Sequence, residues 1–341
     1  MIINSRLKKY QLQFGNFDSF SELKKNNNQL VIISDVFFKN DIRLKKFKRK
    51  IFIDANEESK SFENLNHLIK KLLKIKIDKK TILLALGGGV IQDIVSFLAS
   101  ILLRGIDWYF IPTTLLAMGD SCIGGKTSIN FYGIKNQLGN FYPPNKILID
   151  INFIYTLPID QINSGVGEIS HYYFVGNKKK IQYLLKFFIN KDYKSLILNS
   201  LKIKKSIIEQ DEFDKNVRLL LNFGHTFGHA LESYYNYKIP HGCAVVIGMK
   251  LSVFISNKLK YLGSKSFKEM NIILDQIYYE KKLLVKKINI NKYFILLSKD
   301  KKMMNGKLRP ILTKGIGRMF ISSIALEARF KRLVKQFFIN Y

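Results

Sequence analysis

Residues 81–93 read TILLALGGGVIQD, an apolar run followed by three glycines and a segment that ends on Asp93. A short apolar run of this kind is typical of a strand buried on both faces of a sheet. Glycines let the backbone turn sharply and approach a ligand closely, and the N-terminus of a following helix favours an anion such as a pyrophosphate. The stretch therefore predicts the strand, turn and helix of a nucleotide-binding fold. It lacks the G-x-G-x-x-G pattern, however, and tight packing alone would also explain its glycines.

Similar apolar runs on both sides of this stretch extend the pattern. They occupy residues 29–34, 50–54, 108–112 and 146–150. A segment with helical spacing, residues 61–77, lies between the second run and residue 81. This alternation predicts an α/β fold in which residues 1–150 form a Rossmann-like domain with a parallel sheet.

The second half of the chain has a different pattern. After residue 150 the strand signals fade, and apolar residues recur at helical spacing with lysines between them in residues 178–210, 217–235, 243–262 and 321–341. We therefore expect residues 151–341 to form an all-helical domain.

Composition restricts the class of protein. The chain has 341 residues, of which 47% are hydrophobic, which excludes a disordered chain and suffices for two domains. Its two cysteines, Cys122 and Cys243, exclude a disulfide framework and fit a reducing compartment. Residues 81–103 are apolar but contain Asp93 and three glycines, so a buried strand and helix are expected there rather than a membrane span. The first residues lack the apolar core of a signal peptide. We expect a cytoplasmic protein without a membrane segment.

The net charge of +30 raises the question of a nucleic-acid partner. The basic residues are 47 lysines and only nine arginines, and the lysines are spread along most of the chain. Lysine accompanies many Ile, Asn, Phe and Tyr residues, which share A/T-rich codons. We therefore interpret the charge as a bias of composition and expect no nucleic-acid partner. A basic nucleic-acid-binding protein is the non-enzyme alternative.

A second glycine-rich stretch, residues 112–127, reads PTTLLAMGDSCIGGKT. The sequence GGKT ends like a P-loop, but the spacing of the glycines excludes one. What the stretch retains is a glycine-rich loop with the ammonium group of Lys126, which suits a phosphate. Lys135 and Asn136 add a further cation and a further hydrogen-bond donor.

Histidine placement gives a third signal. Of five histidines, three lie within 17 residues: His225, His229 and His241. His225 and His229 have i, i+4 spacing and face the same side of a helix, which suits either a zinc chelate or two hydrogen-bonded core residues. The spacing alone leaves both open. A carboxylate such as that of Glu168 would complete a His₂Glu site with one open position, the arrangement of catalytic zinc.

Taken jointly, these segments resemble the 3-dehydroquinate synthase family of sugar-phosphate cyclases. The matching blocks are residues 87–93, 104–105, 112–127, 135–136, 165–168 and 221–241, within a resemblance that runs from about residue 54 to residue 321. The resemblance implies an N-terminal NAD-binding domain, a C-terminal helical domain that binds metal and substrate, and an active site in the cleft between them. It also implies conversion of 3-deoxy-D-arabino-heptulosonate 7-phosphate to 3-dehydroquinate and phosphate, the second step of the shikimate pathway, with NAD used catalytically.

The resemblance further assigns residues to roles. The divalent-metal ligands, for zinc or cobalt, would be Glu168, His225 and His241, and His229 would face the substrate instead. The residues that would contact NAD are Glu57, Lys60, Gly88, Gly89, Val90, Ile91, Asp93, Thr113, Thr114, Lys126 and Lys135. The residues that would surround the substrate are Arg104, Asp120, Lys126, Asn136, Lys204, Arg218, Asn222 and His229. In the family the residue at Arg104 reaches the substrate of the neighbouring subunit, which implies a homodimer. Lys301 or Lys302 would close on the phosphate.

Four departures from the family stand near these residues, and two of them are Gly119 in place of an apolar residue and Cys122 in place of a small polar one. His171 replaces a lysine, and we expect it still to donate one N–H to the substrate. Gln92 replaces a glycine in the nucleotide turn. The alternatives within enzymes are a sedoheptulose 7-phosphate cyclase, against which Lys204 and Arg218 argue as carboxylate-binding cations, and a metal-dependent polyol dehydrogenase, against which the phosphate-binding set argues.

Overall fold

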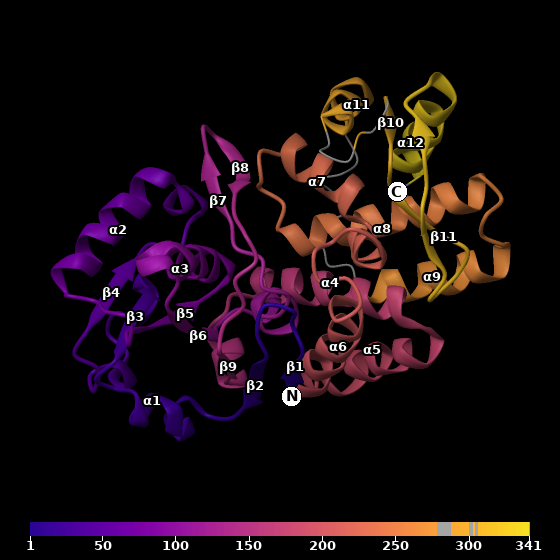
Figure 1. Ribbon diagram of the computed structural model, residues 1–341. Helices are drawn as coiled ribbons and strands as arrows, with labels where there is room; N and C mark the ends of the chain where they lie inside the picture. The colour runs from indigo at the N-terminus through magenta and orange to yellow at the C-terminus, as the bar shows by residue number, and fades with distance from the viewer. Residues whose placement is uncertain (278–287, 300–302, 304–305, 341) are drawn as a thin grey trace. The chain divides into compact units, whose positions relative to one another are not determined.

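The computed structural model describes residues 1–277, 288–299, 303 and 306–340 (Figure 1). It divides the chain into two compact units, Met1–Leu157 and Pro158–Tyr341. No helix among the described residues combines the length and the apolar character needed to cross a membrane.

The first unit is built on a seven-stranded sheet with the strand order β1-β2-β9-β6-β5-β3-β4. All neighbours are parallel except β1 and β2. The strands are β1 Ile2–Ile3, β2 Tyr10–Phe14, β3 Leu30–Asp35, β4 Lys50–Ile53, β5 Ile82–Gly87, β6 Asp107–Pro112 and β9 Lys146–Ile149. The Rossmann-like prediction is confirmed, and the five predicted runs are β3, β4, β5, β6 and β9. The strands β1 and β2 add an edge that the apolar pattern does not predict.

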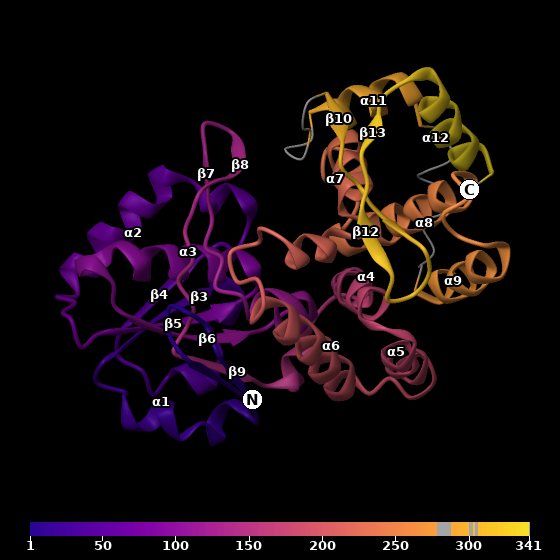
Figure 2. The same ribbon diagram turned by 45° about the vertical axis from the view of Figure 1, so that its right-hand side comes forward.

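Helices and a hairpin complete this unit. They are α1 Ser21–Lys25, α2 Phe62–Lys74, α3 Gly89–Ile101 and the strands β7 Ile129–Phe131 and β8 Ile134–Leu138. Figures 1 and 2 place α2 and α3 on one side of the sheet and α1 on the other. The side chain of Ser61 caps α2 by accepting from the backbone N–H of Asn64 at 3.3 Å, and three leucines of α2 are buried. The strand β5 passes directly into α3 through Gly88, so the nucleotide turn forms as predicted.

The second unit is predominantly helical, as expected. Its helices are α4 Ile159–Gly176, α5 Lys178–Asn190, α6 Tyr193–Ile208, α7 His225–Tyr234, α8 His241–Lys258, α9 Ser264–Ile277, α11 Ile290–Ser298 and α12 Ala328–Asn340. The helix α8 is buried around most of its circumference and packs against α4, α7, α9 and α12 (Figures 1 and 2). A helix that is apolar on all sides belongs at the centre of a domain, and α8 forms that centre.

The structure differs from the predicted helices at three places. Residues 217–235 form the short 3₁₀ helix Val217–Asn222 and, after Gly224, the helix α7. Residues 178–210 form two helices, because Lys191 adopts a left-handed φ of 55° and Asp192 caps α6 through the backbone N–H of Ser195. The predicted tail helix begins only at Ala328. Short strands precede it, and they form the two-stranded sheets β10 Lys307–Leu308 with β13 Ile324–Ala325 and β11 Ile311–Thr313 with β12 Met319–Ile321.

Candidate functional site

Glycines let three helical segments of the second unit approach one another closely. A Cβ atom on Gly242, in the first turn of α8, would lie 1.7 Å from the carbonyl oxygen of Ser164 on α4. A Cβ atom on Gly248 of α8 would lie 2.0 Å from the carbonyl oxygen of Gly224, which precedes α7. Only glycine fits at such distances, so these contacts bring α4 and the start of α7 directly against α8.

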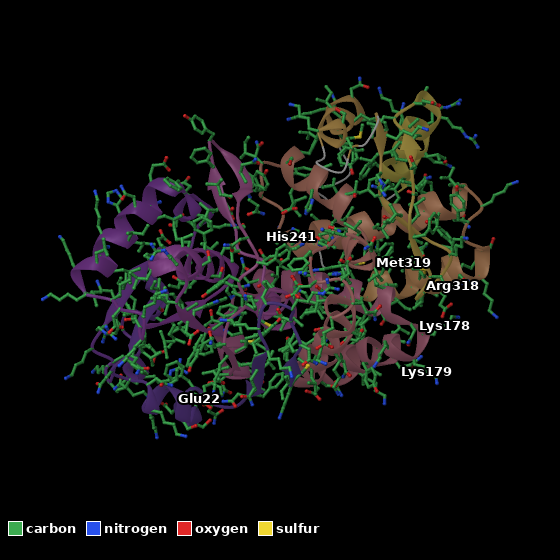
Figure 3. All side chains as sticks on the ribbon, viewed as in Figure 1. Glu22, Lys178, Lys179, His241, Arg318 and Met319 are labelled. Atoms are coloured by element: carbon green, nitrogen blue, oxygen red, sulfur yellow. The ribbon has the colours of Figure 1, made fainter. Side chains whose placement is uncertain are left out.

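Three side chains meet where these helices meet: Glu168 of α4, His225 at the start of α7, and His241, the first residue of α8, which Figure 3 labels. The Nε2 atom of His225 lies 3.3 Å from Oε1 of Glu168, and the Nε2 atom of His241 lies 3.3 Å from Oε2. Glu168 is only 4% exposed. One carboxylate and two imidazoles converge here, which is the ligand set of a catalytic zinc with an open position.

The chemistry of these atoms tests whether a cation fits. Among the described residues, no hydrogen-bond donor satisfies the buried Oε2 atom of Glu168. The Nδ1 atom of His241 faces a carboxylate oxygen of Glu232 at 3.0 Å and therefore carries a hydrogen, so a neutral His241 turns the lone pair of Nε2 toward Oε2. Two acceptors that face each other require a proton or a metal ion between them. The residues present fit a divalent metal.

The pKa shifts of Glu168 and His241 also favour a bound cation. Burial by itself would raise the pKa of the Glu168 carboxyl, but His225 and His241 hold that pKa well below its usual range. Burial would lower the pKa of His241, but Glu168 and Glu232 raise it well above its usual value. Both pKa shifts show that the cluster favours positive charge beside the Glu168 carboxylate, which is where a bound cation would lie.

His229 lies one turn beyond His225 on α7, as its spacing predicts, but outside the buried cluster. Its side chain is exposed, and its ring stacks on that of His241 with centroids 5.6 Å apart. Its ligand atom groups with those of Glu232 and His241, whereas that of His225 groups with those of Glu168 and His241. The geometry thus favours the cluster with Glu168 over a chelate formed by the i, i+4 pair.

His171 is oriented differently from our expectation. It is buried on α4, and its Nδ1 atom is hydrogen-bonded to the backbone carbonyl oxygen of Glu168. A carbonyl oxygen only accepts, so Nδ1 carries the hydrogen and the neutral ring has none on Nε2. The neutral side chain therefore has no second N–H for a substrate, because the backbone already uses the one it has.

The other expected substrate residues of this unit lie on α6 and on the turn before α7. The side chain of Lys204 is buried, with its Nζ atom 5.9 Å from the centroid of the Tyr172 ring on α4. Arg218 is also buried, and its guanidinium donates to the carbonyl oxygen of Glu212. Asn222 is half-buried and donates to the carbonyl oxygen of Leu219 at 2.9 Å.

In the first unit, the three positions of the nucleotide turn are occupied by glycine for different reasons. A Cβ atom on Gly87 would lie 2.4 Å from the side chain of Ile91, and one on Gly88 would lie 2.9 Å from that of Thr114. A Cβ atom on Gly89 would meet no described atom within 4 Å. Packing within the protein therefore explains Gly87 and Gly88, but it leaves open space in front of Gly89 at the N-terminus of α3. This space fits the close approach of a pyrophosphate.

Four of the expected NAD and substrate residues form one network around a buried ammonium group. The Nζ atom of Lys60, a residue that is 4% exposed, lies 2.8 Å from Oδ2 of Asp93 and 3.4 Å from Oε1 of Glu57. It also donates to Oδ1 of Asn136 at 2.8 Å. Ser128 donates to the same Asn136 oxygen. The network holds the β7–β8 hairpin to the helix of the nucleotide turn.

The other expected NAD residues lie in the first turn of α3, which contains Val90 and Ile91, and in the segment after β6, which contains Thr113 and Thr114. The backbone N–H of buried Thr113 donates to the carbonyl oxygen of Gly87 at 3.0 Å. The Thr114 hydroxyl accepts from the backbone N–H of Ala117 at 3.2 Å. Ile91 is buried and Val90 is half-buried.

Gln92 joins this turn to the segment that carries Asp120. Its Nε2 atom donates to the carbonyl oxygen of Ser121 at 2.8 Å, and the Ser121 hydroxyl donates back to its Oε1 atom at 2.6 Å. Asp120 itself is half-buried, next to Ser121. A glycine at position 92 could make neither side-chain bond.

Two expected phosphate contacts are exposed, and one more is half-buried. Lys126 and Arg104 have exposed side chains, and Lys135 is half-buried. The backbone at Leu103, Arg104 and Gly105 is left-handed, with φ of 50°, 64° and 103°. Lys301 and Lys302 lie outside the described residues.

Sequence reasoning missed Glu232 of α7. Its spacing of seven residues from His225 places it on the same helix face two turns away, which could have indicated it. The partner it contacts, His241, is on another helix, and only the fold reveals that contact.

The sequence of this chain matches a known protein family and a curated relative. Residues 50–164 match the family described as 3-dehydroquinate synthase N-terminal, and residues 165–303 match 3-dehydroquinate synthase C-terminal. The chain is 38% identical over 339 residues to the 3-dehydroquinate synthase of Endomicrobium trichonymphae, with 93% of each chain covered.

Solved structures show the same fold. A 2-deoxy-scyllo-inosose synthase complexed with carbaglucose-6-phosphate, NAD⁺ and Co²⁺ superposes with a TM-score of 0.85 at 21% identity, covering 100% of this chain and 99% of that one. The 2-epi-5-epi-valiolone synthase of Streptomyces hygroscopicus, with NAD⁺ and Zn²⁺ bound, gives a TM-score of 0.80 at 22% identity, covering 98% of this chain and 99% of that one.

Proposed function

This chain belongs to the 3-dehydroquinate synthase family, and we propose that it converts 3-deoxy-D-arabino-heptulosonate 7-phosphate to 3-dehydroquinate and phosphate. The enzyme is a phosphate-eliminating lyase that uses NAD and a divalent metal. When bound, NAD accepts and returns a hydride, and the metal polarises the substrate oxygens that it contacts. The observation that carries the proposal is the buried cluster of Glu168, His225 and His241, whose ligand atoms converge and whose donor set fits a divalent metal.

In the second unit, Glu168, His225 and His241 would hold the metal, and His229 would face the substrate from the exposed side of the cluster. Lys204 and Arg218 would bind the substrate carboxylate. Their burial suits this role, because a charge-assisted hydrogen bond is stronger where water is excluded. Asn222 would offer an amide to a substrate hydroxyl.

In the first unit, the open space in front of Gly89 would admit the pyrophosphate of NAD. The ion pairs of Lys60 with Glu57 and Asp93 would hold the segments beside that site in place. Thr113 and Thr114 would line it from the segment that follows β6. Exposed Lys126 and half-buried Lys135 would meet negatively charged groups, and Asp120 and Asn136 would meet hydroxyl groups.

The test is to supply the purified protein with the heptulosonate phosphate and to measure phosphate release and product. We expect turnover that requires NAD⁺ only in catalytic amount, without accumulation of NADH. His225→Ala should abolish metal binding and turnover together, whereas His67→Ala, an exposed histidine on α2, should change neither. Phosphate release that persists after exhaustive chelation would contradict the proposal.

The same assay separates the alternatives. A sedoheptulose 7-phosphate cyclase would turn over the substrate that lacks the carboxylate, and Lys204→Met would then have little effect. A polyol dehydrogenase would accumulate NADH in proportion to the polyol consumed.

We also propose that the protein acts as a homodimer in which Arg104 serves the neighbouring active site. Its exposed guanidinium and its left-handed backbone fit a residue presented outward from its own unit. Mixing inactive Arg104→Ala with inactive His225→Ala should restore part of the activity, since a mixed dimer then contains one complete site. No restoration in a verified mixed dimer would refute the role across subunits.

We propose that the high positive charge does not form a nucleic-acid-binding site. We also propose that the protein acts in the cytoplasm. A gel-shift titration should show only weak binding that disappears with added salt. Fractionation of the native cells tests the location.

A further inference from the structure

Glu232 contacts the candidate metal centre but belongs to none of the roles described above. It lies on α7, its side chain is 13% exposed, and its Oε2 atom is 3.0 Å from Nδ1 of His241. The opposite ring nitrogen of His241, Nε2, faces Glu168 at 3.3 Å. The imidazole of His241 therefore lies between two carboxylates, one on each nitrogen.

We propose that Glu232 is a positioning residue that prepares His241 to bind the metal through Nε2. A carboxylate only accepts hydrogen bonds, so Glu232 holds the hydrogen on Nδ1 and leaves the lone pair of a neutral ring on Nε2. The negative charge also makes that nitrogen a more basic ligand. The inference rests on the proposed metal centre and assigns a residue to it.

The two histidines of the cluster differ in how they are held. His225 has 10% of its side chain exposed, and its Nδ1 atom faces the backbone carbonyl oxygen of Phe223 at 3.4 Å. His241 has 33% of its side chain exposed, so packing restricts its ring less. A close hydrogen bond from a side chain provides the restriction that packing does not. The hydrogen bond to Glu232 therefore orients the ring of His241, whereas packing orients the ring of His225.

The spacing on α7 makes this arrangement feasible. His225 and Glu232 are seven residues apart, which is two helical turns, and they present their side chains on the same face. The same helix thus supplies one ligand directly and orients the other through a hydrogen bond. The start of α8 needs to lie beside this face, and Gly228 permits that approach, since a Cβ atom there would lie 2.9 Å from the carbonyl oxygen of Ala244 in the first turn of α8.

The experiment measures metal affinity rather than turnover. Metal-free wild type, Glu232→Ala and Glu232→Gln are titrated with Zn²⁺ against a chromophoric chelator, and the visible spectrum of each Co²⁺ form is recorded. We expect Glu232→Ala to lose about 10- to 100-fold in Zn²⁺ affinity, the usual effect of removing such a partner, and to change the Co²⁺ spectrum. Glu232→Gln should lose less, because its amide oxygen still accepts from Nδ1.

A matched control removes a similar carboxylate elsewhere in the same unit. Glu209, at the end of α6, pairs with Lys205 at 2.9 Å and has 22% of its side chain exposed. Glu209→Ala should retain wild-type affinity and the wild-type Co²⁺ spectrum. Circular dichroism establishes that each variant is folded before it is titrated.

The outcomes separate this inference from the proposed function. Glu168→Ala tests the centre itself: if it retains wild-type affinity, the metal centre is elsewhere and the proposed function loses its support. If Glu168→Ala loses the metal while Glu232→Ala keeps both affinity and spectrum, the inference about Glu232 alone is overturned. It is also overturned if the wild type binds two ions and Glu232→Ala simply loses one, because Glu232 would then be a ligand together with His229 and His241.

Discussion

The substitution Gly242→Ala tests the helix contact on which the metal centre depends. The new Cβ atom would lie 1.7 Å from the carbonyl oxygen of Ser164 and 2.8 Å from the backbone nitrogen of Glu168. A carbon–oxygen contact needs about 3.3 Å, so α4 and α8 would have to separate by roughly 1.5 Å. Separation would also stretch the hydrogen bond from the Gly242 N–H to the Ser164 hydroxyl, now 3.0 Å long.

Two costs follow from this displacement. Overpacking a helix contact costs about 1–3 kcal/mol, and the lost hydrogen bond about 1 kcal/mol more, so the free energy of unfolding should fall by roughly 2–4 kcal/mol. His241 is the neighbour of Gly242, and Glu168 lies one turn beyond Ser164, so the two ligands move apart with their helices. Metal–ligand distances tolerate only about 0.2 Å, and we expect Zn²⁺ affinity to fall by more than about 100-fold.

The assay combines urea unfolding of the metal-free protein with a Zn²⁺ titration. Gly263→Ala is the matched control, because its Cβ atom would meet no atom of the described residues within 4 Å, and it should change neither the unfolding midpoint nor the affinity appreciably. If Gly242→Ala does not fold, Gly167→Ala gives a milder form of the same test, since its Cβ atom would lie 2.5 Å from the carbonyl oxygen of Gly242. A folded Gly242→Ala protein with unchanged stability and unchanged Zn²⁺ affinity would refute the reasoning.

Three further substitutions test the first unit. Gly89→Ala should leave the urea midpoint unchanged or slightly higher but weaken NAD binding measured by calorimetry, because its Cβ atom meets no described atom and would occupy the space left for the pyrophosphate; unchanged NAD affinity would place the cofactor elsewhere. The hydrogen bond from Lys146 lowers the pKa of Glu22 to about 2 from 4.5, so the stability that this pair adds is present above pH 4.5 and is lost as the pH falls toward 2. The difference in urea midpoint between wild type and Lys146→Met should therefore shrink below pH 4.5, and a difference that grows there would show the wrong sign. Gln92→Leu keeps the volume but removes both bonds to the Ser121 segment, and we expect the free energy of unfolding to fall by about 1–3 kcal/mol, measured in the same urea titration; an unchanged midpoint would mean that the two bonds add nothing.

Local patterns were sufficient for five of the seven strands in the sheet of the first unit. Central parallel strands are buried on both faces, so each reads as a continuous apolar run, and turn residues mark where each one ends. The strand β2, Tyr10–Phe14, alternates polar and apolar residues over a short stretch and gives no such run. Its place beside β9 follows from contacts more than a hundred residues apart in the chain, which no local pattern contains.

The candidate metal centre shows the same division. The sequence by itself determined that histidines and a carboxylate of the right kinds are present and that His225 and His229 share a helix face, because helical periodicity is local. The spacing alone left open whether this pair chelates zinc or is hydrogen-bonded in the core, and the resemblance to the family assigned Glu168, His225 and His241 as the ligands. The tertiary structure brings Glu168 beside His225 and His241, because α4, α7 and α8 meet where glycines allow their backbones to touch. The same packing brings Glu232 to His241, whereas the hydrogen bond between His171 and the Glu168 carbonyl oxygen is local to α4. Which atoms converge depends on how separate helices pack, and that packing is a property of the whole folded unit.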